Sequence, residues 1–180
     1  MGRIRVVEGD ITELCVDAIV NAANERMLGG GGVDGAIHRA AGPELYQACL
    51  AFPELRPGVR CPTGEARLTE GFGLEAKHVI HTVGPVWQGG ESGEPALLAR
   101  AYQSCLEIAS EQGMRTIAFP AISCGVYGYP IDQAAKTAVR EIQAFLETND
   151  CPQEVLLVAF DSAMTRTLRE STGEAHRDLG

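Results

Sequence analysis

The sequence predicts an α/β domain: a three-layer α/β/α sandwich with a central mixed, mostly parallel sheet. Short β-branched runs alternate with longer stretches that carry apolar residues at helical spacing along the 180-residue chain. Several of the short runs are apolar over most of their length, which is typical of strands covered on both faces. Glycine is abundant: 21 of the 180 residues are glycine, which is more than the usual share of about 7 %. This abundance favours tight turns and close approach of a ligand to bare backbone.

The alternation defines the elements in order. Strands are expected at residues 4–8, 17–21, 65–69, 77–83, 116–120 and 154–160. Helices are expected at residues 33–41, 44–51, 95–112, 131–148 and 162–170, the last with Asp161 or Ser162 as its N-cap. We expect one domain over residues 1–175 and a frayed tail over residues 176–180.

Composition excludes several classes of protein. The net charge of −9 and the pI of about 4.9 provide no basic footprint, so nucleic acid is not an expected partner. The six cysteines form no CxxC pair and show no metal or disulfide spacing, which indicates reduced thiols. We find no apolar signal region and no run long enough to span a bilayer. We therefore expect a cytoplasmic monomer with no membrane partner, no metal and no cofactor.

Two glycine-rich loops each join an expected strand to an expected helix. In the first, Asn21 and Asn24 precede four glycines, Gly29 to Gly32, and a helix follows from Val33. In the second, the segment from Pro120 to Pro130 again carries glycines between a strand and a helix. Backbone N–H groups and helix N-termini at such turns bind phosphate without lysine, which suits an acidic chain. Two such loops could hold a diphosphate from both sides of the crevice where α/β sheets bind ligands.

Several segments resemble the macrodomain family, and within it the MacroD-type subgroup that includes the bacterial O-acetyl-ADP-ribose deacetylases. The matching segments are Gly9-Asp10-Ile11-Thr12, Asn21-Ala22-Ala23-Asn24, Gly29 to Gly42, Cys61-Pro62-Thr63-Gly64, His81 to Trp87 and Phe119-Pro120-Ala121-Ile122-Ser123. The resemblance runs from Ile4 to about Phe160, in the same order as in the family. It implies a macrodomain fold and ADP-ribose as the ligand.

The resemblance also implies roles for individual residues. Asp10 and the Ile11 N–H would bind adenine and Phe160 would pack on it, although Asp10 could instead cap a turn at residues 12–14 and Phe160 could lie in the core. Asn24 would hold the distal ribose. The backbones of two segments would hold the diphosphate and the adjoining ribose: Gly31, Gly32, Val33 and Asp34, and Ser123, Cys124, Gly125, Val126 and Tyr127. Tyr127 would border the distal ribose or serve loop packing alone, and Asn21 would cap a strand end.

Asp34 matches the catalytic aspartate of the hydrolytic members. An ionised Asp34 near the distal ribose would orient or deprotonate a water for attack on an ester carbonyl. A substrate phosphate could take that role instead, and an acidic residue in a first helical turn also has a purely structural explanation. Asn24 would share the catalytic site. His38 lies four residues after Asp34 and is expected to pair with it structurally.

The remaining polar candidates carry weaker hypotheses. His78 and His81 lie on one expected strand, but no ligand-spaced cluster accompanies them, so a metal site is not expected. Cys124 could pair with His81 as a nucleophile, although a passive loop cysteine is favoured.

The leading hypothesis is a metal-independent hydrolase of ADP-ribose esters. It would convert O-acetyl-ADP-ribose to ADP-ribose and acetate and remove mono-ADP-ribose from the acidic side chains of modified proteins. The alternative is a non-catalytic reader of ADP-ribose. A phosphatase and an RNA-binding protein are less favoured.

Overall fold

The computed structural model describes residues 3–173, and the tail expected at residues 176–180 lies outside that range. Within it, the strands form one six-stranded sheet in the order β1-β6-β5-β2-β4-β3. Their bounds are β1 (Ile4–Glu8), β2 (Ala18–Ala22), β3 (Ala66–Glu70), β4 (His78–Thr82), β5 (Thr116–Phe119) and β6 (Glu154–Ala159). All neighbours are parallel except β3, which is antiparallel to β4. The predicted mixed, mostly parallel sheet is confirmed.

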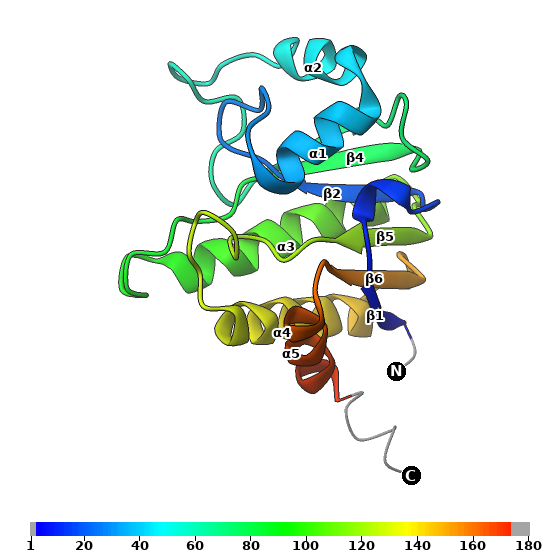
Figure 1. Ribbon diagram of the computed structural model, residues 1–180, viewed down its shortest axis with the longest axis vertical. Helices are drawn as coiled ribbons and strands as arrows, with labels where there is room; N and C mark the ends of the chain where they lie inside the picture. Colours follow the sequence, from blue (N-terminus) through cyan, green and yellow to red (C-terminus); the bar gives the residue numbers. More distant parts are fainter. Residues whose placement is uncertain (1–2, 174–180) are drawn as a thin grey trace.

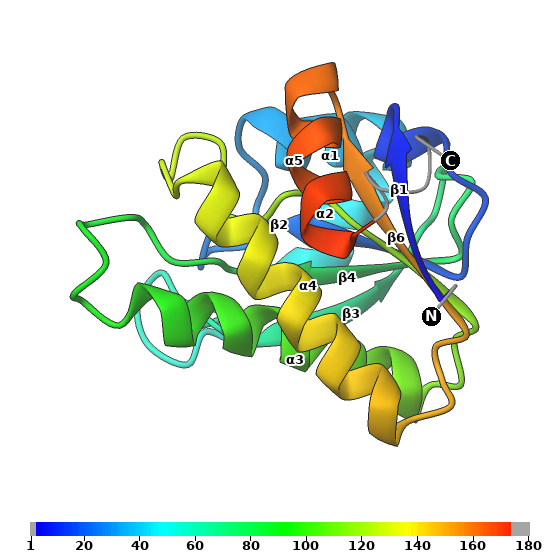
Figure 2. The same ribbon diagram turned by 90° about the horizontal axis from the view of Figure 1, so that it is seen from below.

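Helices cover both faces of this sheet (Figure 1). One layer is α1 (Gly32–Ala41) and α2 (Pro43–Leu50); the other is α3 (Glu94–Glu111), α4 (Ile131–Thr148) and α5 (Ser162–Thr172). Ile37 and Leu45 belong to a core with Ile19 and Val79, on the α1–α2 face. A second core lies under α3, α4 and α5, where α3 and α4 run side by side (Figure 2). The three-layer sandwich is therefore confirmed.

The predicted elements are all present, with small shifts at their ends. Residues 131–148 form α4 as predicted. Strand β5 ends at Phe119 rather than at Pro120, because proline has no N–H to continue a ladder. Asp161 is the N-cap of α5 and accepts a hydrogen bond from the Met164 N–H. Among the described residues, no helix is both long and apolar enough to cross a membrane.

The strand order determines where a ligand can bind. Strands β1, β6, β5 and β2 are consecutive parallel neighbours, so their carboxyl ends lie at one edge of the sheet. Each of these four strands leads directly into one of the segments that the sequence singled out: Gly9 and Asp10, Phe160, the second glycine-rich loop and the first glycine-rich loop. The fold thus gathers four separate motifs at the edge where α/β sheets bind ligands.

Candidate active site at the carboxyl edge of the sheet

Asn24 and Asp34 lie on either side of Gly30. A Cβ atom placed on Gly30 would be 3.3 Å from Asp34 Oδ2 and 3.4 Å from Asn24 Nδ2, so any side chain at this position would press on both groups. The Asn24 side chain also holds the loop: its Oδ1 accepts from the N–H groups of Arg26 (3.1 Å) and Met27 (3.2 Å), and its Nδ2 donates to the Gly29 carbonyl (3.2 Å). The two predicted catalytic residues are therefore neighbours.

Asp34 lies in the first turn of α1 and is almost fully buried, with 4 % of its surface exposed. Asn21 Nδ2 donates to Asp34 Oδ1 at 2.8 Å, and His38 Nε2 lies 3.5 Å from the same oxygen. Burial raises the pKa of Asp34, while the Asn21 hydrogen bond and the charge of His38 act in the opposite direction. The result is a desolvated carboxylate of increased basicity. The predicted pairing of His38 with Asp34 is confirmed as a contact of 3.5 Å, without a hydrogen bond between the two side chains.

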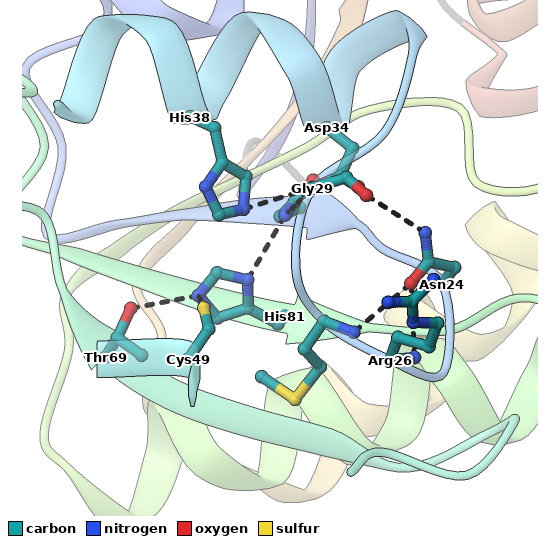
Figure 3. A network of polar contacts seen from close by, with 10 residues as sticks. Asn24, Arg26, Gly29, Asp34, His38, Cys49, Thr69 and His81 are labelled. Atoms are coloured by element: carbon teal, nitrogen blue, oxygen red, sulfur yellow. Dashed lines mark hydrogen bonds and ion pairs between the residues drawn. The ribbon is translucent and has the colours of Figure 1, made fainter. Parts of the chain in front are cut away.

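Asn21 was expected to cap a strand end, and that expectation is wrong. The residue is inside β2, is fully buried, and bonds to both Asp34 and His81 Nδ1 (3.1 Å). His81 in turn contacts Thr69 Oγ1 at 2.9 Å and Cys49 Sγ at 3.8 Å (Figure 3). A polar residue within an otherwise apolar strand was the available sequence signal for Asn21. Thr69 and Cys49 had none, because they come from distant segments.

The second loop is built from backbone hydrogen bonds. The N–H groups of Cys124, Gly128 and Tyr129 donate to the carbonyls of Ala121, Gly125 and Ser123. The three N–H groups between Cys124 and Gly128 make no such bond within residues 3–173, which leaves them for a ligand. The Tyr127 carbonyl accepts from the Trp87 N–H at 2.8 Å, which ties the backbone of this loop to residue 87, and the role of the Tyr127 side chain stays a prediction.

Asp10 follows β1 and Phe160 follows β6, the first two strands in the order of the sheet. Asp10 Oδ1 accepts from Thr12 N (2.9 Å) and Thr12 Oγ1 (2.7 Å), capping a short 3₁₀ turn, Ile11–Glu13. The hydrogen bond from the Thr12 hydroxyl has the larger effect on the pKa of Asp10, followed by that from the Thr12 N–H, and both lower it. The capping role predicted for Asp10 is therefore present, whatever else the carboxylate binds. Phe160 is 77 % exposed, so its placement in the core, considered as an alternative, is wrong.

The structure does not pair Cys124 with His81. Cys124 Sγ donates to the Ile122 carbonyl (3.6 Å), and burial raises the pKa of this thiol to about 11. Both ring nitrogens of His81 have other partners. The hypothesis of a Cys124–His81 nucleophile is therefore wrong. In the part of the chain that the structure describes, no three His, Cys, Asp or Glu side chains are grouped to hold a metal ion, and His78 belongs to no such group.

Comparison with known proteins identifies the family. Residues 20–138 match the model of the Macro domain family. A macro domain-containing protein of Xanthomonas axonopodis pv. citri is 56 % identical over 94 % of each chain. An O-acetyl-ADP-ribose deacetylase of Salmonella typhimurium is 54 % identical over 91 % of this chain and 90 % of its own. This chain therefore belongs to the Macro domain family, as its motifs predict.

Solved macrodomains share the fold. The macrodomain of Oceanobacillus iheyensis with ADP superposes with a TM-score of 0.87, at 43 % identity, over 96 % of this chain and 91 % of that one. The macrodomain of Trypanosoma brucei in complex with ADP-ribose gives a TM-score of 0.85, also at 43 % identity, over 93 % of this chain and 68 % of that one.

Proposed function

We propose that this protein hydrolyses esters of ADP-ribose and converts O-acetyl-ADP-ribose to ADP-ribose and acetate. The observation that carries the proposal is the pair Asn24 and Asp34, whose side chains lie on either side of Gly30. A buried carboxylate next to an amide, between backbone N–H groups, is suited to bind a ribose ester and activate water. The relatives named O-acetyl-ADP-ribose deacetylase support this assignment.

The order of the strands supports ADP-ribose as the ligand. Along the edge, Asp10, Phe160, the second loop and the first loop follow one another in the strand order β1, β6, β5, β2. ADP-ribose is itself an elongated ligand with adenine at one end and the distal ribose at the other. We assign adenine to Asp10, the Ile11 N–H and Phe160, the diphosphate to the backbones of residues 31–34 and 123–127, and the distal ribose to Asn24. Backbone N–H groups and the N-termini of α1 and α4 supply the positive potential that the net charge of −9 does not.

Asp34 is assigned as the base in hydrolysis. It takes a proton from a water molecule, whose oxygen then adds to the ester carbonyl carbon. N–H groups of the first loop stabilise the negative charge that develops on the carbonyl oxygen. The bond from the carbonyl carbon to the ribose oxygen then breaks, and the ribose oxygen takes up the proton. The raised pKa of Asp34 makes this carboxylate a better proton acceptor than an ordinary aspartate, which supports its assignment as the base. The same chemistry extends to mono-ADP-ribose on acidic side chains, because that linkage is also an ester of the distal ribose.

A chromatographic time course of O-acetyl-ADP-ribose hydrolysis in EDTA tests the proposal. We expect turnover by the wild type, loss of at least about 100-fold in Asp34→Ala, and retained binding of ADP-ribose by that variant. Asp132→Ala is the matched control, because Asp132 is also an acidic residue in the first turn of the helix that follows a glycine-rich loop, but it is exposed.

The outcomes separate the two leading functions. Equal losses in Asp34→Ala and Asp132→Ala would reduce Asp34 to a helix-terminal charge. No turnover by the wild type, with ADP-ribose still bound tightly, would make the protein a reader. Turnover that EDTA abolishes would contradict a metal-independent reaction.

A further inference from the structure

A chain of hydrogen bonds runs through the interior from the edge strand β3 to Asp34. It passes from the Glu70 carbonyl to Thr69 Oγ1 (3.1 Å), from Thr69 to His81 Nε2 (2.9 Å), from His81 Nδ1 to Asn21 Nδ2 (3.1 Å), and from Asn21 Nδ2 to Asp34 Oδ1 (2.8 Å). Asn21, Thr69 and His81 are all buried. Because these residues are largely shielded from water, each proton in the chain must match the donor and acceptor groups beside it.

The direction of the chain follows from its two ends. The Glu70 carbonyl accepts only, so the Thr69 hydroxyl donates to it and presents a lone pair to His81 Nε2. His81 Nε2 therefore carries the ring proton, and Nδ1 is an acceptor. At the other end an ionised Asp34 also accepts only, so Asn21 must present its NH₂ group, which donates one hydrogen to Asp34 and the other to His81 Nδ1. Both ends require the same tautomer.

The structure shows the cost of this arrangement. With its NH₂ group turned to Asp34 and His81, Asn21 leaves its own Oδ1 buried without a hydrogen-bond partner among the described residues. The opposite amide orientation would place Oδ1 against the carboxylate, where two acceptors repel. A second tautomer, with the proton on Nδ1, requires that opposite orientation. The tautomer of His81 and the donor available to Asp34 are therefore coupled through the amide of Asn21.

We propose that Thr69 and His81 are positioning residues, which hold the Asn21 amide so that it donates to Asp34 and keeps that carboxylate ionised and aligned. The inference rests on the catalytic role proposed for Asp34. The charged or titratable groups around the ring are Asp34 and His38 on α1, Cys49 on α2 and Arg67, which is opposite His81 in the β3–β4 ladder. Burial, and then the charge of His38, lowers the pKa of His81 to about 3, so the ring is neutral at neutral pH. The raised pKa of Cys49, about 12, keeps that neighbour uncharged as well.

Thr69→Val tests the chain, because valine has nearly the shape of threonine but offers His81 no lone pair. The ring then gains by moving its proton to Nδ1, the Asn21 amide turns, and the carboxylate loses its donor and favours its protonated form. We expect kcat to fall roughly tenfold at neutral pH, the order of effect for losing a hydrogen bond to a charged group. We expect the acid limb of the pH profile of kcat, where kcat falls as the pH is lowered, to move to higher pH, with KM little changed. Thr69→Ser keeps the hydroxyl and should restore the wild-type profile.

Thr82→Val is the matched control. Thr82 is a fully buried threonine on β4, and its hydroxyl donates to the Glu65 carbonyl rather than to the chain. It should lose stability without a shift of the acid limb. If Thr69→Val and Thr82→Val share the wild-type acid limb, or if Thr69→Ser shifts it as Thr69→Val does, the proposal is wrong.

Nitrogen NMR of the His81 ring in the wild-type protein provides a readout that needs neither a variant nor an active enzyme. A proton on Nε2 and a bare Nδ1 support the chain, and a proton on Nδ1 or a charged ring overturns it. Failure of the proposed function appears instead as no hydrolysis by the wild type, whatever the tautomer of His81.

Discussion

The two glycine-rich loops leave neighbouring strands at the same edge of the sheet, yet they are held in different ways. The first loop, between β2 and α1, is held by side chains: Asn24 binds three backbone groups, and Asp34 is anchored to Asn21 beneath it. The second loop, between β5 and α4, is held by its own backbone bonds, and its tip residue Val126 is fully exposed. The first loop thus has fixed functional groups, and the second has a fixed shape with free N–H groups.

The difference matches the two tasks of the proposed reaction, which are the chemical step at the first loop and binding of the diphosphate at the second. The proposed ester hydrolysis requires that the Asp34 carboxylate and the Asn24 amide keep their positions to within a fraction of an ångström. Buried side-chain networks provide that precision. Binding of a diphosphate requires several N–H donors on a surface, which a backbone turn provides whatever its side chains are. Perturbation of the first loop should therefore act mainly on rate, and perturbation of the second mainly on stability and binding.

Among changes that leave both Asn24 and Asp34 in place, the largest expected effect comes from filling the space between them. In Gly30→Val the new side chain contacts both groups, because even a Cβ atom would lie 3.3 Å from Asp34 Oδ2 and 3.4 Å from Asn24 Nδ2. We expect kcat/KM for O-acetyl-ADP-ribose to fall by roughly 100-fold, as for a displacement of about 1 Å in a catalytic group. Steady-state kinetics measures the loss, and thermal melting establishes that the variant is folded. Wild-type kinetics in a folded Gly30→Val protein would show that the reacting ester lies elsewhere.

The next effect concerns the pH dependence of stability. Because the pKa of Asp34 is raised in the folded protein, the folded state binds more protons than the unfolded state between the ordinary and the raised value. Folding therefore becomes less favourable as the pH rises through the raised pKa. Asp34→Asn removes this titration while its amide oxygen can still accept from Asn21. We expect Asp34→Asn to unfold at a higher denaturant concentration than the wild type at pH 8.

The gap in denaturant midpoint between Asp34→Asn and the wild type should narrow toward pH 4, where the wild-type carboxyl becomes protonated. Ser123→Ala in the second loop changes no titratable group, so its difference from the wild type should be the same at both pH values. An Asp34→Asn advantage that widens on acidification would mean that the pKa of Asp34 is lowered, not raised.

The sequence predicted the fold and the two loops because both depend on local patterns. Apolar runs define the strands, glycines mark the turns, and the family motifs place Asn24 and Asp34 in one loop. It did not predict the support beneath Asp34. Thr69, His81 and Cys49 come from β3, β4 and α2, and their meeting depends on the antiparallel pairing of β3 with β4 and on the packing of α2. The capping role of Asp10 could be predicted because the hydrogen bond from the Thr12 N–H to its carboxylate joins residues only two positions apart. Long-range polar contacts leave no periodic signal in one sequence.

The smallest expected effect is a change in stability on substituting Ser123 in the second loop. Ser123 adopts a positive φ of 68°, and its buried Oγ, which lies against Gly84, has no hydrogen-bond partner among the described residues. A buried hydroxyl without a partner costs free energy, so removing it should be favourable. We expect Ser123→Ala to raise the free energy of unfolding by about 1 kcal/mol. Ser123→Gly should match Ser123→Ala, because relief of the strain is offset by the greater chain entropy of glycine.

Ser104→Ala is the matched control for that gain, because the Ser104 hydroxyl is also buried but donates to the Gly64 carbonyl at 2.7 Å. It should lower the free energy of unfolding by about 1 kcal/mol, the ordinary value of a satisfied hydrogen bond. Denaturant unfolding of the three variants measures both signs in one experiment. Opposite signs for Ser123→Ala and Ser104→Ala would show that the second loop keeps its shape at the expense of a side chain. Equal losses would mean that the Ser123 hydroxyl has a partner, and that side chains hold the second loop as they hold the first.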